Sequence, residues 1–336
     1  MNTGDTESER RVVFLTGANG FVGSHIVRAL LDRKYRIRAL TRPKADCSRI
    51  EGLDVERVIG DLDDVRALRE GVRGADFIIH NAGRVRAPSP EAYHHANCLG
   101  TIKLLDAVEE AAPNIRRFVY VSSQAAGGPS PQGRPKVEDD PNVPHTPYGE
   151  SKLAGEQAVM ARASKLPVVT VRPPAVYGPE DTAILAVFQT VGWHIKPLFG
   201  PQPQHISVVH VQDLVSGILL AMESDAASGQ TFFIAEDRPY TLAEMDNLIQ
   251  QALKTWAIFI RFPAPLLMSI AWTNDMIGKA FGFVPRLNRD KARDFLARNW
   301  TCSTEKARRL LGYKSQIAFA EGAKMTAQWY RARGWL

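Results

Sequence analysis

Two groups of residues in this sequence have types and spacings suited to chemistry. The first is a set of three glycines, Gly17, Gly20 and Gly23, between an apolar stretch and an amphipathic segment. Glycines at a strand-to-helix junction permit a tight turn and let backbone N–H groups approach phosphates. The N-terminus of the helix adds a partial positive charge. The corner is therefore predicted to bind a pyrophosphate, with a plain strand–turn–helix corner as the alternative.

The second group is Tyr148 and Lys152, four residues apart at the start of a predicted helix that follows the proline-rich loop 141–147. Their side chains share one helix face, one turn apart. A phenol has a pKa of about 10, and a nearby ammonium lowers it toward the range useful for proton transfer at neutral pH. Tyr148 is thus a candidate general acid/base, and the Lys152 ammonium is also suited to bonding ribose hydroxyls.

Two further polar side chains accompany this pair. Ser123 follows the predicted strand 118–121, so its hydroxyl is expected at the carboxyl end of a parallel strand, where it can bond a substrate carbonyl. Asn97 lies in a predicted covering helix, and its amide is suited to holding a water in a proton relay. Each residue alone arises often by chance, but their joint occurrence downstream of the glycine corner favours an active site.

These residues need a scaffold, and the pattern up to Arg172 indicates one. Strands are predicted over 12–15, 36–40, 55–59, 76–80, 118–121 and 168–171, and helices over 21–33, 63–71, 93–112 and 148–165. This alternation predicts an α/β protein with a doubly wound parallel sheet of the Rossmann type.

After Arg172 the alternation breaks, which indicates a second unit. Helices are predicted over 183–192, 211–223 and 242–254, and a strand is predicted over 231–235. Residues 206–209 form a short apolar run. We predict that residues 11–172 and 206–235 form the dinucleotide-binding domain, and that residues 173–205 and 236–336 form a smaller, mostly helical substrate-binding lid. The polar residues 1–10 are predicted to be a disordered lead-in without a signal peptide.

Composition narrows the class of partner. The 336 residues are 45% hydrophobic and carry a formal net charge of +6, which favours anionic ligands. No nucleic-acid-binding motif accompanies the basic residues, whose densest region, 286–309, suggests a solvated helix face. The three cysteines lie far apart and the histidines lack ligand spacing, so we predict no metal site and a cytoplasmic location.

Taken together, the motifs resemble the extended short-chain dehydrogenase/reductase superfamily along nearly the whole chain. The resemblance rests on residues 16–23, 60–62, 80–83, 123, 148, 152, 172–179 and 210–214. It implies that Tyr148 is the general acid/base, that Lys152 tunes Tyr148 and holds the ribose, that Ser123 positions the reacting oxygen and that Asn97 supports the relay.

The same resemblance implies a set of cofactor contacts and a mode of assembly. The implied contacts are Gly17, Asn19, Gly20, Phe21, Val22, Gly23, Arg42, Asp61, Leu62, Asn81, Ala82, Gly83, Tyr148, Lys152, Pro173 and Val176. The implied assembly is a homodimer that pairs helices 93–112 and 148–165.

Cofactor choice depends on the end of the second strand. An acidic residue there would bond the ribose hydroxyls of NAD, whereas an arginine would accept the 2′-phosphate of NADP. The sequence has Arg42 at this place, with Lys44 as a possible second charge. NADP(H) is therefore favoured over NAD(H), with a solvent-exposed loop arginine as the alternative interpretation.

Two departures from the superfamily pattern bear on the substrate. Nucleotide-sugar epimerases and dehydratases of this kind generally carry an asparagine where this chain has Ala175, and an arginine where it has Ile206. Residues 256–283 are rich in large apolar side chains that can line a pocket. This pattern is closer to the 3β-hydroxysteroid dehydrogenase, dihydroflavonol reductase and 2-alkyl-3-oxoalkanoate reductase branch. Core packing of two helices and peripheral membrane contact are the alternatives for the apolar region.

We therefore expect an NADP(H)-dependent oxidoreductase that interconverts a secondary alcohol and a ketone on a hydrophobic or bulky small molecule. The enzymatic alternative is a nucleotide-sugar epimerase or dehydratase that uses bound NAD. An alternative of another class is a noncatalytic regulator that senses dinucleotides, although the intact Tyr148 and Lys152 pair argues against it.

Overall fold

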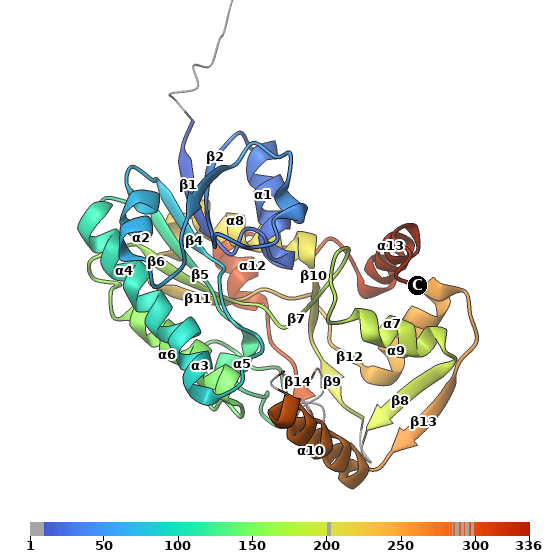
Figure 1. Ribbon diagram of the computed structural model, residues 1–336. Helices are drawn as coiled ribbons and strands as arrows, with labels where there is room; N and C mark the ends of the chain where they lie inside the picture. The colour runs from blue at the N-terminus through green and yellow to red at the C-terminus, as the bar shows by residue number, and fades with distance from the viewer. Residues whose placement is uncertain are drawn as a thin grey trace, which may run out of the picture.

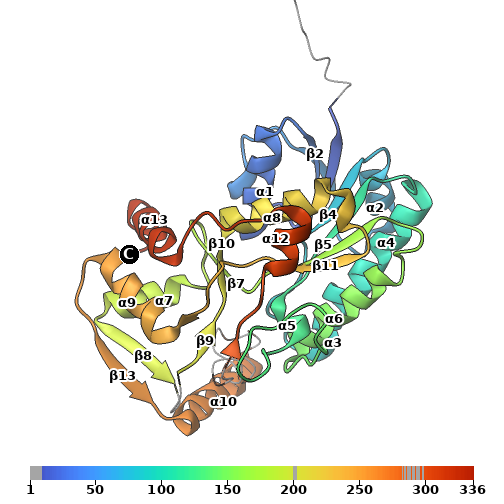
Figure 2. The ribbon, with the colours of Figure 1, turned by 180° about the vertical axis from the view of Figure 1, so that it is seen from behind.

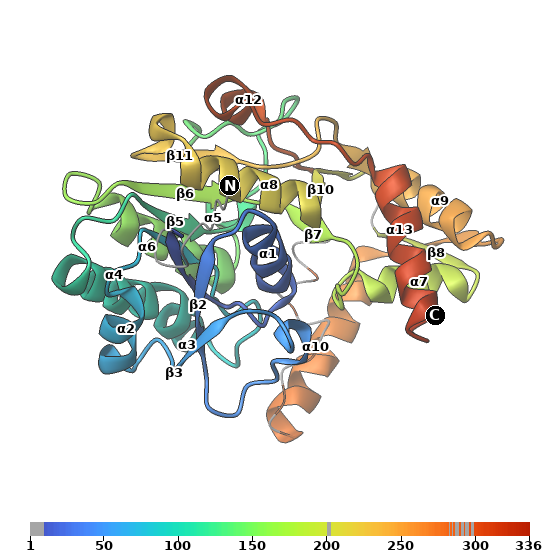
Figure 3. The ribbon, with the colours of Figure 1, turned by 90° about the horizontal axis from the view of Figure 1, so that it is seen from above.

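The structure, a computed structural model, has a parallel sheet at its centre with helices on both faces (Figures 1 and 3). The residues it describes are 10–199, 203–281, 283, 285, 289, 292, 296 and 299–336. Residues 1–9 of the predicted lead-in, and most of the basic region between 286 and 298, therefore lie outside the described residues.

Seven strands form the central sheet in the order β11-β6-β5-β4-β1-β2-β3. They are β1 (Val12–Thr16), β2 (Arg36–Thr41), β3 (Glu56–Ile59), β4 (Phe77–His80), β5 (Arg117–Val121), β6 (Val168–Arg172) and β11 (Gln230–Phe233). All neighbouring strands run parallel. The predicted Rossmann-type sheet is confirmed, and its order reverses between β1 and β4, which is where such sheets bind ligands.

Each face of the sheet has its own apolar core. On one face lie α1 (Phe21–Asp32), α8 (Val211–Glu223) and α12 (Glu305–Leu311), and on the other α2 (Val65–Val72), α4 (Gly100–Ala111) and α6 (Pro147–Met160). Figure 3 shows these two layers from above. Every residue of β5 and β6 is buried, as expected for parallel strands covered on both sides.

The helix predicted over 93–112 is one continuous helical stretch with a change of winding. It comprises α3 (Pro90–His94), a π-helical turn over His95–Leu99 and α4. A π turn inserts an extra residue and often occurs at functional sites. Here it carries Asn97.

The remaining elements form a smaller unit beside the sheet, seen at the right of Figure 1 and from behind in Figure 2. Its helices α7 (Leu185–Gly192), α9 (Leu242–Leu253) and α13 (Phe319–Ala332) share an apolar core, and α10 spans Ala264–Phe281. Its short strands are β7 (Ala175–Tyr177), β8 (Ile195–Phe199), β9 (His205–Ile206), β10 (Val208–His210), β12 (Tyr240–Thr241), β13 (Ile258–Phe262) and β14 (Asn299–Trp300). The short helices η2 (Ser48–Ile50), α5 (Gln124–Gly127) and η4 (Asp225–Ala227) lie in connections of the larger unit.

The short apolar run 206–209 is divided between two strands. Ile206 belongs to β9, which pairs with β12, whereas Val208 to His210 form β10, which pairs with β7. The alternative interpretation of 256–283 as the core packing of two helices is wrong. Residues 258–262 form β13, which pairs in parallel with β8. The pairing partner is distant in sequence, so no local pattern reveals it.

Core packing does not account for the apolar side chains of 256–283 either. Trp256, Ile258, Phe259, Leu266, Ile270, Trp272, Met276, Ile277, Phe281 and Phe283 are all exposed, with fractions between 43% and 78%. Only a few side chains of α10, among them Leu267, are buried.

Candidate active site

The glycine corner between β1 and α1 has the geometry that a bound phosphate requires. Gly17 has a φ of +73°, in the left-handed region that favours glycine. A Cβ atom at position 23 would lie 1.9 Å from the Gly17 carbonyl oxygen. Gly20 caps α1 without any side-chain hydrogen bond, and the first turn of α1 contains no acidic residue. The first N–H groups of α1 are thus uncapped by side chains, which fits the pyrophosphate of a dinucleotide.

The loop after β4 packs directly on this corner. The Ala82 N–H donates to Thr16 Oγ1 at 3.1 Å, and Asn81 Nδ2 donates to the Gly17 carbonyl at 3.3 Å. Buried His80 hydrogen-bonds Thr16 at 2.7 Å, and burial lowers the pKa of His80 to about 3. A neutral imidazole therefore ties the two loops together at the point where the strand order reverses.

The edge formed by β2 and β3 is the predicted adenosine end. Arg42 follows β2 and is exposed, and Asp61 and Leu62 follow β3. Asn19, in the glycine corner, donates to the Asp46 carbonyl at 2.9 Å and so fixes the loop that follows Arg42. The sequence-predicted contacts of this end therefore lie on neighbouring strands.

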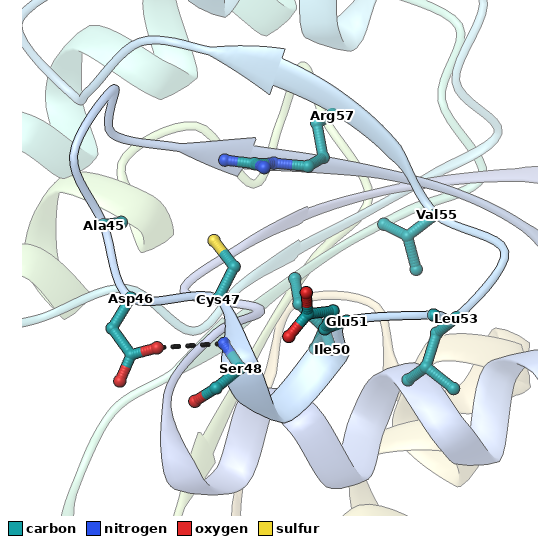
Figure 4. A pocket seen from close by; sticks show the side chains of 10 residues that line it. Ala45, Asp46, Cys47, Ser48, Ile50, Glu51, Leu53, Val55 and Arg57 are labelled. Carbon is teal, nitrogen blue, oxygen red and sulfur yellow. Dashed lines mark hydrogen bonds between the residues drawn. The ribbon is translucent and has the colours of Figure 1, made fainter.

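A shallow cavity of about 470 Å³ opens at this same edge (Figure 4). It is lined by Ala45, Asp46, Cys47, Ser48, Ile50, Glu51, Gly52, Leu53, Val55 and Arg57. The Arg57 guanidinium extends over it, and its Nε donates to Thr41 Oγ1 at 3.2 Å, next to Arg42. Sequence reasoning missed Arg57, because only the pairing of β3 with β2, which sets Arg57 opposite Ala39, lets its side chain reach Thr41 at the end of β2.

Helix α6 carries Tyr148 and Lys152, and its start is well defined. Pro147 occupies the first helical turn, and the Thr146 hydroxyl accepts from the Gly149 N–H at 3.2 Å. A Cβ atom at Gly149 would lie 2.5 Å from the Ala125 carbonyl oxygen. This close approach places the first turn of α6 against α5, the helix that Ser123 caps.

Lys152 joins α6 to the end of β5. Its Nζ donates to the Val121 carbonyl at 2.8 Å and lies 4.3 Å from the centre of the Tyr120 ring. Burial lowers the pKa of Lys152 to about 7, against an upward effect of Glu156. Burial therefore favours the neutral amine, and the predicted ammonium loses its proton at a lower pH than an exposed lysine does.

The two residues that carry the hydroxyl groups of the site, Ser123 and Tyr148, are both half-buried. Ser123, half-buried, accepts from the Ala125 N–H at 3.2 Å through Oγ, which leaves its O–H free to rotate toward a partner. Tyr148 is half-buried, and its ring lies 6.0 Å from that of Tyr93. Both hydroxyls come from elements at the carboxyl end of β5.

Asn97 fills a supporting place beside them. Its Oδ1 accepts from the Arg84 N–H at 2.7 Å, and its Nδ2 donates to the Arg84 carbonyl at 3.0 Å and to Ser151 Oγ at 2.9 Å. Both Nδ2 hydrogens are used by protein atoms. The amide thus fixes the loop that contains Gly83 onto α6, between Tyr148 and Lys152.

A buried ion pair joins α6 to the end of β6. Arg172 at the end of β6 donates through Nε to Glu156 Oε1 at 2.9 Å, and both side chains are 4% exposed. The next residue, Pro173, accepts from the Gln124 N–H at 2.8 Å through its carbonyl. Val176, also a predicted cofactor contact, is half-buried in β7. These contacts hold the strand ends around the site in one arrangement.

The lowered pKa of Lys152 leads to a prediction about cofactor binding. If only the ammonium bonds the ribose hydroxyls, affinity falls as rising pH removes its proton, by about tenfold between pH 6 and pH 8. Fluorescence titration with NADPH measures the dissociation constant across this range. The Lys152→Met variant is the control, since it should bind more weakly at pH 6 and lack this part of the dependence. Parallel pH profiles of the two proteins would refute the assignment.

The site combines a glycine corner, at the point where the order of the parallel sheet reverses, with a serine, a tyrosine and a lysine around the end of β5. This combination defines a dinucleotide-dependent enzyme. Residues 13–235 match the NAD dependent epimerase/dehydratase family. The chain belongs to this family and is an extended short-chain dehydrogenase/reductase. Among the described residues no group of three or more His, Cys, Asp or Glu side chains is placed to hold a metal ion.

Relatives and solved structures extend the similarity over the full chain. The ceramide reductase of Caulobacter vibrioides is 32% identical over 97% of this chain and 96% of its own. The 4-hydroxy-2-methyl-3-oxo-4-farnesyl-3,4-dihydroquinoline-1-oxide ketoreductase of Stigmatella aurantiaca is 28% identical over 92% of this chain and 93% of its own. The crystal structure of gox2253 matches with a TM-score of 0.81 and 27% identity, covering 97% of this chain and 100% of that one.

Proposed function

We propose that this enzyme is an NADP(H)-dependent oxidoreductase that interconverts a secondary alcohol and a ketone on a hydrophobic or bulky substrate. The observation that carries the proposal is the junction of α6 with the end of β5. There the Lys152–Val121 bond and the close approach of Gly149 to Ala125 bring the elements of Tyr148, Lys152 and Ser123 together. In the proposed division of the chain, residues 11–172 and 206–235 hold the cofactor and the rest forms the substrate lid.

Each side chain then has a distinct task in the reaction. During reduction the Tyr148 phenol donates its proton to the carbonyl oxygen, and the Ser123 hydroxyl donates a hydrogen bond to the same oxygen. Together they stabilise the developing alkoxide. Lys152 orients the ribose, and Asn97 positions the loop at Gly83. A bound nicotinamide supplies the hydride, or accepts it in the reverse direction.

An apolar substrate is supported by what the chain lacks and by its relatives. Ala175 in β7 and Ile206 in β9 stand where the sugar-nucleotide enzymes are expected to carry polar contacts. Two relatives are named for acting on ceramide and on a farnesylated quinoline, and both compounds contain long apolar groups. We extend this chemical class to the present chain, together with a cytoplasmic location. We also propose a homodimer formed through α4 and α6. Light scattering measures the mass of the particle in solution and so tests this assembly.

The test is NADPH oxidation by the purified enzyme with matched ketone panels. We expect turnover with long-chain or polycyclic ketones and none with short polar ones. Sugar nucleotides serve as the competing panel. Release of an epimerised or dehydrated sugar without net NADPH consumption would favour the epimerase alternative, and NADPH binding without turnover on any panel would favour the regulator.

A further inference from the structure

The outward face of α10 is apolar. Its buried positions, Leu267, Ala271 and Gly278, follow a helical spacing of four and seven residues. The exposed positions on both sides of this stripe carry large apolar side chains, namely Leu266, Ile270, Trp272, Met276, Ile277 and Phe281, with exposed fractions of 43% to 78%. A surface helix of a globular protein ordinarily presents charged residues to water.

Charge is scarce on this helix among the residues whose side chains are described. Asp275 is paired with Arg289 at 3.0 Å, and its side chain is only 19% exposed. The other exposed positions between 264 and 278 are Pro265, Ser269 and Thr273, which carry no charge. Between residues 264 and 278 the exposed positions of α10 therefore carry no charge, and their apolar side chains are contiguous, unlike the single scattered apolar residues on the surface of ordinary monomers.

The exposed apolar surface continues onto β13, the strand that leads into α10. Ile258 and Phe259 are exposed, and Trp256 stacks on His194 at a ring distance of 4.0 Å while 62% exposed. We call the exposed apolar side chains of residues 256–259 and 266–281 the α10 face. Figures 1 and 2 show β13 and α10 together along one margin of the molecule.

Basic residues surround this surface in the sequence. Residues 254–289 contain five basic residues, Lys254, Arg261, Lys279, Arg286 and Arg289, and a single acidic one, Asp275. Tryptophan and phenylalanine with flanking lysine and arginine are the composition of helices that lie in the interface of a bilayer with anionic lipids.

From these observations we infer that the α10 face docks on the surface of a lipid bilayer that contains anionic headgroups. Within the described residues, no helix combines the length and apolar character that crossing a membrane demands. The helix therefore lies in the plane of the interface, with Leu266, Ile270 and Ile277 among the acyl chains. The exposed side chains of Lys254 and Arg261 then extend toward the phosphates.

The docking surface is connected to the active site through short contacts. Leu267 and Ala271 pack with Ala292 in a small apolar cluster, just before β14 in the chain. The Asn299 carbonyl of β14 accepts from the Ser130 N–H at 3.0 Å, in the loop after α5. If the proposed function holds, docking through the α10 face would bring a lipophilic ketone to the side of the enzyme where β14 contacts the loop that follows α5, the helix that Ser123 caps.

Flotation of the full chain with vesicles tests the docking independently of catalysis. The vesicles are phosphatidylcholine alone, or phosphatidylcholine with about 30% phosphatidylglycerol, a composition that supplies anionic headgroups. We expect binding to the anionic vesicles, weakened by 0.5 M salt. The double variant Ile270→Glu with Ile277→Glu should bind at least about tenfold more weakly, because two charges replace apolar side chains that become buried in the bilayer on docking.

A matched control tests whether a charge weakens vesicle binding only on the α10 face or at any exposed apolar position. Val65 on α2 is 42% exposed, nearly the same as Ile270 at 43%, and lies far from α10 in Figures 1 and 2. Val65→Glu should therefore bind vesicles like the unchanged protein. Circular dichroism and thermal melting check that each variant folds. If the double variant fails to fold, quenching of tryptophan fluorescence by brominated lipid in the unchanged protein provides the readout. The Trp272→Phe variant should show less quenching.

Three outcomes would overturn the inference. One is the absence of vesicle binding at either composition, and another is equal binding of the double variant and the control. The third is a dimer that dissociates in the double variant while no vesicle binding occurs, which would make a second copy of the chain the occupant. Failure of turnover with apolar ketones leaves the vesicle result unaffected, so the two proposals fail separately.

Discussion

Replacing Tyr148 by phenylalanine is expected to lower kcat by at least about a thousandfold, because the change removes the proton donor and one hydrogen bond to the developing alkoxide. The dissociation constant for NADPH should stay within about twofold, since the glycine corner and Lys152 remain in place. Single-turnover kinetics with saturating NADPH and an apolar ketone measure the first quantity, and fluorescence titration measures the second. This pattern separates a catalytic role from a binding role.

Tyr93 offers a matched control for this variant. Its ring lies 6.0 Å from that of Tyr148, and it is 5% exposed. Tyr93→Phe removes the same hydroxyl from a neighbouring ring and should retain kcat within a few-fold. Near-normal turnover of Tyr148→Phe, or an equal loss in both variants, would show that the Tyr148 phenol is not the proton donor.

Replacing Arg42 by alanine should weaken NADPH binding by about a hundredfold, because a guanidinium that grips a phosphate contributes charge-assisted hydrogen bonds of about 1.5–3 kcal/mol each. NADH lacks the 2′-phosphate, so its affinity should change by less than about twofold. Arg57→Ala should show a smaller loss, about tenfold, since its Nε already bonds Thr41 and only the rest of the guanidinium can reach a phosphate. Calorimetric titration of both cofactors gives these ratios.

Arg66 on α2 serves as the control for cofactor selectivity. It is an exposed arginine of the helix that follows β3, and Arg66→Ala should leave both affinities unchanged. Equal losses of NADPH and NADH affinity in Arg42→Ala would mean that Arg42 supports the loop and does not read the phosphate. No loss with either cofactor would make Arg42 a solvent-exposed loop residue.

The sequence was sufficient for the features that depend on local spacing. Gly17 and Gly23 predict the corner because only glycine fits at either position. Gly17 has a left-handed φ, and a Cβ atom at Gly23 would lie 1.9 Å from the Gly17 carbonyl oxygen. The parallel strands were predictable because burial on both faces demands continuous apolar runs. Tyr148 and Lys152 share a helix face for the same local reason, a spacing of four residues.

Only the tertiary structure decided the features that depend on distant partners. The register of β3 on β2 lets Arg57 reach Thr41, the residue before Arg42. The amide of Asn97 is occupied by Arg84 and Ser151. The pKa of Lys152 falls to about 7 because β5 and α6 together exclude water from it.

The apolar stretch 256–283 shows the same division between local and distant information. Its composition was compatible with a pocket, a core and a membrane contact, since hydrophobicity is a property of the side chain alone. Which side of α10 is covered depends on whether another segment packs there. The spacing of residues within a segment can be taken directly from the sequence. The burial of a side chain depends on which other segment packs against it, and only folding determines that.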